Sequence, residues 1–181
     1  MITATKVARV LLVADQTLFR TGVARLLEGD PRIEIVGQAF DGADAVIQAE
    51  KLRPDVILMD LKMPNVDGIE ATRQIIASNP DARVLILTTF ETDNHVIQAL
   101  KAGASGYVLK DSLVEAIVSS ILAVAAGERV MASAVANRVL GMLSGTSTPK
   151  EFYDWLTVRG VEILRLLATG MANKQIAFRL K

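Results

Sequence analysis

Four polar side chains in this sequence are of the types needed to act together on a phosphoryl group: Asp15, Asp60, Thr88 and Lys110. Two neighbouring carboxylates repel each other, and a hard divalent cation such as Mg²⁺ allows both to stay ionised. An ammonium and a hydroxyl bind oxygens of a phosphoryl group, while the metal binds another. In that arrangement Asp60 is a candidate nucleophile toward phosphorus. Each residue alone is more often a turn or cap former, so the hypothesis depends on all four lying together.

Apolar runs should bring these side chains to one edge of a sheet. The run Val56–Met59 leads straight into Asp60 and is apolar throughout, as in a strand buried on both faces. Strand and helix patterns alternate five times, which predicts an α/β fold with a parallel sheet and helices on both faces. The carboxyl ends of parallel strands share one edge, where ligands bind in open α/β sheets. The predicted strands are Val7–Val13, Ile33–Ala39, Asp55–Met59, Arg83–Thr88 and Gly106–Leu109.

The last helix of this α/β part is unusually apolar. We expect it to start at Ser112, which has capping-box spacing to Glu115, and to run to about Gly127. One apolar stripe of this helix must face the sheet. The apolar residues outside that stripe predict a second buried face, which is covered either by a following linker helix or by a second copy of the chain. The other predicted helices are Thr17–Glu28, Ala43–Leu52, a helix ending near Ser78, and Glu91–Ala102 with Gly103 as its C-cap.

The C-terminal part of the chain has a different pattern. A predicted helix over Ala132–Leu143 carries little charge, and Ser144–Pro149 has the composition of a linker. Thr157 is a good N-cap for a helix that Gly170 ends, and Asn173 caps a shorter helix. Two short helices cannot bury their apolar faces alone, so we expect the sequence to be part of a longer protein.

Composition excludes several classes of protein. The chain has no cysteine, and His95 is its only histidine, so we expect neither a disulfide nor a zinc site. No apolar run approaches the ~20 residues of a membrane span, and the N-terminus lacks a signal-peptide core. We therefore expect a cytoplasmic protein without membrane contact. Residues 1–128 carry 12 basic and 17 acidic residues, whereas residues 129–181 carry 8 basic and 3 acidic ones, a balance that permits nucleic-acid binding by the tail.

Several motifs together resemble a known family. The runs RVLLVADQTLFRTGV, DVILMDLKMPNVDGIEA, VLILTTF and ALKAGASGYVLKD are similar to a two-component response-regulator receiver domain. The likeness is to the NarL/FixJ-like subfamily, and the tail LTVRGVEILRLLATGMANKQIAFRL resembles the first half of a LuxR-type helix-turn-helix domain. The resemblance implies a flavodoxin-like doubly wound sheet of five parallel strands in the order 2-1-3-4-5. It implies a receiver domain over 1–128, a linker with a helix over 129–154, and a partial all-α DNA-binding domain over 155–181.

The same resemblance implies roles for the residues at the sheet edge. Asp60 matches the phosphoacceptor, which receives its phosphoryl group from a sensor histidine kinase. Asp15, Asp60 and the backbone carbonyl of Lys62 match ligands of Mg²⁺, and Lys110 matches the lysine that contacts the phosphoryl group. In such proteins a phosphoryl group adds roughly −1.5 to −2 charges, which a bistable surface element must carry outward.

The output side is likewise implied by the resemblance. Thr88 matches the switch hydroxyl, and Tyr107 matches the aromatic side chain whose ring turns inward when that hydroxyl moves. Phosphorylation would then favour a homodimer and control DNA binding. A LuxR-type domain resembles four helices, and the sequence ends after the second, so the recognition helix is expected to be absent here. Lys174 is a candidate phosphate contact, with a solvated surface lysine as the alternative.

Two positions depart from the family pattern. Ala14 stands where the family has a second acidic residue, which removes one carboxylate from the metal pocket. The alternative hypothesis is therefore an atypical receiver that acts without phosphorylation as a protein-interaction module. Gly160 stands where the family usually has a glutamate, which removes the capping-box partner of Thr157.

The sequence argues against two classes of enzyme. An aspartate-nucleophile phosphatase needs a second acid two residues after the nucleophile, and that position holds Lys62. A Rossmann-type dehydrogenase needs G-x-G-x-x-G after the first strand, which is missing. We therefore expect no enzyme activity beyond the protein's own phosphorylation and dephosphorylation.

Overall fold

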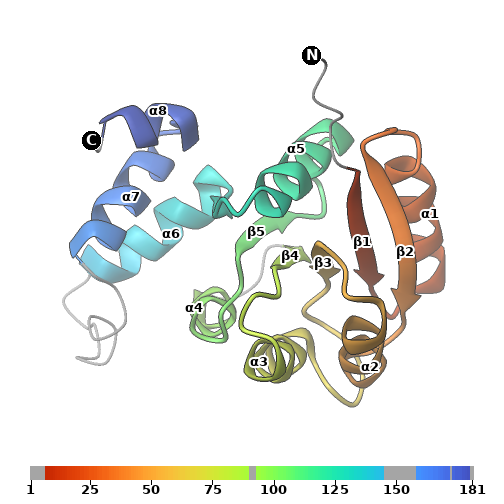
Figure 1. The fold of residues 1–181 in the computed structure, drawn as a ribbon. Coiled ribbons are helices and arrows are strands. Elements are labelled where there is room, and N and C mark those ends of the chain that lie inside the picture. Colours follow the sequence, from red (N-terminus) through yellow and green to blue (C-terminus); the bar gives the residue numbers. More distant parts are fainter. Residues whose placement is uncertain (1–6, 90–92, 145–157, 172, 180–181) are drawn as a thin grey trace.

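A computed structural model describes residues 7–89, 93–144, 158–171 and 173–179, and its strands form one parallel sheet (Figure 1). The strand order is β2-β1-β3-β4-β5-β6, so the predicted order of the first five strands is confirmed. The predicted total of five is wrong, because β6 pairs with β5 through Val130 and Met131. The strands are β1 (Ala8–Val13), β2 (Ile33–Ala39), β3 (Val56–Met59), β4 (Val84–Thr88), β5 (Gly106–Leu109) and β6 (Val130–Met131).

Helices cover both faces of the sheet, as the alternating patterns predict. Helices α1 (Thr17–Leu27) and α5 (Val114–Ala125) pack on one face, and α2 (Gly42–Leu52), α3 (Gly68–Ser78) and α4 (Asp93–Lys101) pack on the other. The helices α6 (Ser133–Ser144), α7 (Val158–Ala168) and α8 (Asn173–Arg179) follow. In the part of the chain that is described, no helix has the length and apolarity that crossing a bilayer requires.

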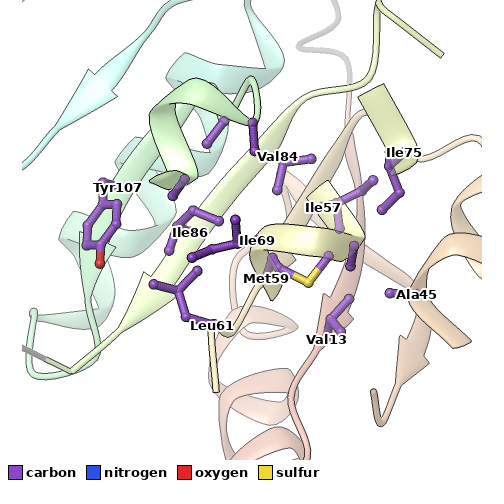
Figure 2. Packing of buried hydrophobic residues seen from close by; sticks show 14 of the residues in the cluster. Val13, Ala45, Ile57, Met59, Leu61, Ile69, Ile75, Val84, Ile86 and Tyr107 are labelled. Atoms are coloured by element: carbon purple, nitrogen blue, oxygen red, sulfur yellow. The ribbon is translucent and has the colours of Figure 1, made fainter. Parts of the chain in front are cut away.

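Alternating side chains of the central strands supply two separate apolar cores. In β1, Val10 and Leu12 face α1 and α5, whereas Leu11 and Val13 face α2, α3 and α4. This is the period of two expected of a strand, with both faces buried because helices lie on each side. Figure 2 shows the second of these, here called the α2–α4 core, whose labelled side chains are Val13, Ala45, Ile57, Met59, Leu61, Ile69, Ile75, Val84, Ile86 and Tyr107.

The α2–α4 core continues beyond the sheet into the C-terminal helices. Val135 and Val139 of α6 and Leu164 of α7 belong to the same buried cluster as Val96 and Ala99 of α4. Helix α6 therefore packs between α4 and α7 (Figure 1). The prediction that the linker helix lies along the second face of α5 is wrong, because the buried side of α6 is directed toward α4. The other prediction, a second copy of the chain on α5, stays a prediction.

Helix ends follow the expected chemistry at some positions and not at others. Gly103 has φ +99° just after α4, and Gly170 has φ +77° just after α7, which confirms both predicted helix ends. The predicted capping box at Ser112 is wrong: α5 begins at Val114, with Leu113 as an N-cap that makes no side-chain cap bond. The short C-terminal helix includes Asn173 as its first residue. The predicted N-cap Thr157 lies outside the described residues.

Candidate functional site

Three neighbouring strands end together and present the predicted polar residues. Asp60 directly follows β3, Thr88 is the last residue of β4, and Lys110 directly follows β5. Backbone bonds fix these ends: the Asp60 N–H donates to the Val13 carbonyl at 2.9 Å, and the Lys110 N–H donates to the Thr88 carbonyl at 2.8 Å. The order β1-β3-β4-β5 therefore brings residues that are far apart in the sequence to one edge.

Asp60 and Lys110 form a buried ion pair at that edge. The Lys110 Nζ donates to the Asp60 Oδ2 at 2.5 Å, and the side chains are 16% and 4% exposed. Burial raises the pKa of the Asp60 carboxyl, although the hydrogen bond and charge of Lys110 and the backbone N–H groups of Lys62 and Leu61 oppose the rise. The Asp60 carboxylate is thus withdrawn from water and held against the Lys110 ammonium.

Lys110 has a second contact, which the residue pattern does not predict. Its Nζ lies 4.4 Å from the centroid of the Phe19 ring, a cation–π distance. Phe19 falls on the apolar stripe of the predicted first helix, so the pattern assigns it only to the core. The one signal that could have identified it is an aromatic residue four positions after Asp15, at the start of α1.

Asp15 offers an unused ligand atom at the same side of the sheet. It lies two residues after β1, and its Oδ1 is buried without a hydrogen-bond partner among the described residues. A cavity of about 510 Å³ is lined by Asp15, Leu61, Lys62, Met63, Pro64, Asp67, Ile69 and His95. Asp60 does not line this cavity directly.

These residues fit Mg²⁺. The ion commonly takes one or two carboxylates, further oxygen ligands and several waters, and the buried Asp15 Oδ1 has no other partner in the described structure. Asp15, Asp60 and the carbonyl of Lys62 supply that kind of oxygen set. The described residues contain no group of three or more Asp, Glu, His or Cys side chains arranged for a metal, so the metal would depend on two carboxylates.

Ala14 leaves the candidate metal site without a third carboxylate. Ala14 is 1% exposed, and its N–H donates to the Ala39 carbonyl at 3.1 Å. Its own carbonyl accepts from the Arg20 Nη1 at 2.5 Å. The methyl side chain offers no metal ligand, and Asp15 remains the acidic residue at the end of β1.

Thr88 and Tyr107 are both buried, at 1% exposure each. Tyr107 belongs to the α2–α4 core, where Figure 2 shows its ring at the edge of the cluster. The ring is therefore in an inward position in this structure. The side chain of Lys174 lies outside the described residues, so its contact with a DNA phosphate stays a prediction.

Comparison with known proteins identifies the family. A family model for the response regulator receiver domain matches residues 10–122. The chain belongs to this family. The receiver match spans nearly all of β1 and every element from α1 to β5, and so includes the edge that carries Asp60, Thr88 and Lys110.

Relatives and solved structures agree with this receiver assignment and extend it beyond the matched segment. The chain is 44% identical over 168 residues to the transcriptional regulatory protein LiaR of Bacillus subtilis, covering 93% of this chain and 80% of LiaR. It is 38% identical over 169 residues to the response regulator VraR of Staphylococcus aureus, covering 93% and 79%. A LuxR-family two-component response regulator from Aurantimonas superposes with a TM-score of 0.73 at 36% identity, over 77% of this chain and 100% of that chain. The protein is thus a two-component response regulator of the LuxR family.

Proposed function

We propose that this response regulator accepts a phosphoryl group on Asp60 from a sensor histidine kinase. The observation that carries the proposal is the 2.5 Å pair between Lys110 and a nearly buried Asp60 at the edge of a receiver sheet. A cation this close to a carboxylate of raised pKa is arranged to balance negative charge arriving on that carboxylate. Neither the site nor the comparisons favour the alternative of a phosphorylation-independent interaction module.

The chemical step follows from the positions of these groups. One carboxylate oxygen of Asp60 attacks phosphorus, and the bond from phosphorus to the donor breaks, with its electron pair leaving on the donor. Lys110 stays protonated and moves its hydrogen bond from Asp60 to a phosphoryl oxygen. Asp15, Asp60 and the Lys62 carbonyl are the residues that would hold Mg²⁺, which would supply further positive charge at the site when bound.

The output is proposed to be control of dimerisation and DNA binding by a transcription factor. Thr88 and Tyr107 are the proposed switch residues, since both are buried, Thr88 ends β4 at the edge that carries Asp60, and Tyr107 belongs to the α2–α4 core. That core reaches Val135 and Leu164, so a change at Tyr107 has a packed route toward the C-terminal helices. The proposed domain limits are 1–128 for the receiver, 129–154 for the linker and 155–181 for the part of a LuxR-type domain.

Intact-mass measurement tests the phosphoacceptor. The protein is incubated with Mg²⁺ and acetyl phosphate, with Asp60→Asn as the matched control. We expect one added phosphoryl group on the wild type and none on the variant. An equal mass shift on Asp60→Asn, or none on either protein, would contradict the proposal.

Calorimetric titration with Mg²⁺ alone tests the metal ligands without phosphorylation. We expect weaker binding by Asp15→Asn than by the wild type, since that variant loses the buried carboxylate oxygen. Ala14→Asp should bind more tightly, because it adds a carboxylate next to Asp15. Equal affinity of all three proteins would contradict the assignment of Asp15.

A further inference from the structure

We propose that Phe19 is a positioning residue for Lys110, whose ammonium its ring holds at the phosphoacceptor. This inference rests on the proposed function and deepens it. The ammonium lies 2.5 Å from the Asp60 Oδ2 and 4.4 Å from the centroid of the Phe19 ring. The lysine side chain is only 16% exposed, so water screens these contacts weakly.

The ring is fixed by the connection between β1 and α1. The Arg20 side chain, next to Phe19, donates to the Ala14 carbonyl at 2.5 Å, and the Arg20 N–H donates to the Gln16 carbonyl at 2.9 Å. These bonds tie the first turn of α1 to the end of β1. Phe19 is also packed, partly buried, on the core beneath α1 and α5. The ring therefore does not depend on Asp60 or Lys110 for its position.

That independence gives the ring a role that a carboxylate cannot have. When Asp60 is phosphorylated, its negative charge moves outward onto phosphoryl oxygens, and Lys110 must release Oδ2 to follow it. A lysine side chain has many rotamers, and an ammonium without a fixed neighbour would spread over them. The face of Phe19 attracts the ammonium in both states, so Lys110 stays near the site while its anionic partner moves.

Two variants separate this role from simple packing. Phe19→Leu keeps an apolar side chain but removes the aromatic face, whereas Phe19→Tyr keeps that face. Val23→Ala is the control, because Val23 packs on the same core from the same helix. Asp60 phosphorylation by acetyl phosphate and Mg²⁺ should be about five-fold slower in Phe19→Leu and within about two-fold of wild type in Phe19→Tyr and Val23→Ala.

A double variant tests whether the effect passes through Lys110. In a Lys110→Met background, Phe19→Leu should cause no further slowing, since the ammonium is already gone. An equal loss in that background, or a wild-type rate for Phe19→Leu, would overturn the inference. If the wild type itself gains no phosphoryl group on Asp60, the proposed function fails instead, and the two failures are thereby distinguished.

NMR gives a readout that needs no phosphorylation. The ring current of Phe19 should shift the Cε protons of Lys110 upfield in the wild type and in Phe19→Tyr, and this shift should be lost in Phe19→Leu. Unshifted Lys110 protons in the folded wild type would overturn the inference whatever the kinetics show.

Discussion

Gly68→Ala tests whether the start of α3 must lie directly against the backbone of Asp60, the proposed phosphoacceptor. Gly68 is the first residue of α3, and a Cβ added there would lie 2.1 Å from the Asp60 carbonyl oxygen and 2.9 Å from the Leu61 Cα. The Gly68 N–H donates to the Leu61 carbonyl at 2.9 Å, and its own carbonyl accepts from the buried Thr72 hydroxyl at 2.6 Å. Gly68 does not have a left-handed φ, so the cost of alanine is steric.

The expected cost follows from the size of the clash. The contact must lengthen from 2.1 Å to at least 3.0 Å, a displacement of about 0.9 Å. The atoms in the way belong to the backbone of Asp60 and Leu61, which is held by hydrogen bonds to β1 and to α3, so no flexible side chain can move aside. Overpacking of this kind costs roughly 1–3 kcal/mol, and we expect the upper end, about 3 kcal/mol. For a chain of this size that lowers the thermal midpoint by roughly 6–12 °C.

Differential scanning calorimetry measures this change, and Gly22→Ala is the matched control. Gly22 lies inside α1, and an added Cβ would meet no heavy atom within 4 Å apart from its chain neighbours and the nearby backbone of its own helix, so alanine there should stabilise the protein by about 0.5–1 kcal/mol. Phosphorylation of Asp60 should also be slower in Gly68→Ala than in Gly22→Ala, because the Asp60 backbone has to shift. A wild-type midpoint for Gly68→Ala would refute the steric argument.

Four other substitutions test three separate features. Burial raises the pKa of Asp60, so the folded state loses stability as pH rises through that pKa. Asp60→Asn cannot ionise and should therefore raise the calorimetric midpoint at neutral pH, by roughly 2–4 °C for each kcal/mol of unfolding free energy regained. The gain in midpoint should vanish in acid, where Asp60 is protonated in the wild type as well. A pH-independent difference would contradict this. The Asp67 side chain accepts hydrogen bonds from two N–H groups at the start of α3, so Asp67→Ala should lower the free energy of unfolding in urea by about 1 kcal/mol. The N-cap of α1, Gln16, makes no such bond, so Gln16→Ser should raise that free energy by a comparable amount. Changes of the same sign in both would count against the capping argument. Arg53 has φ 46° at the end of α2, so Arg53→Gly should stabilise by about 0.5–1 kcal/mol in the same titrations, and a loss would show that its side-chain contacts dominate.

The sheet was predictable from the sequence because its strands are largely runs of apolar residues. Ile33–Ala39 and Gly106–Leu109 agree with the structure at both ends, and the other three predicted strands start only one residue early. Strand β6 was not predictable, because a pair of residues has no period to detect. The start of α5 was predicted too early, since the spacing of Ser112 and Glu115 fits a capping box that the chain does not form.

The candidate site was predictable as a set of strand ends but not as a set of contacts. Parallel strands bring Asp60 and Lys110 to the same edge whatever their rotamers, and the structure places them in contact. The direction of the Phe19 ring and the packing of α6 on α4 depend on side chains that meet only in the folded protein. A periodic apolar pattern shows that a side chain is buried, not which neighbour it touches.

The two outer strands also affect aggregation. An exposed strand edge is a template for pairing with another chain, and the interior strands here are strongly apolar. At one border, β6 is only two residues long, and the adjacent Arg129 guanidinium is bonded to the Ala104 carbonyl at 3.2 Å. At the other, β2 carries the exposed Glu34 and pairs with β1 through a register shift after Val10. Neither border of the sheet offers a long, flat, uncharged strand edge. Edge-to-edge pairing between the sheets of two copies of this protein is therefore disfavoured, and association through helical surfaces is favoured instead.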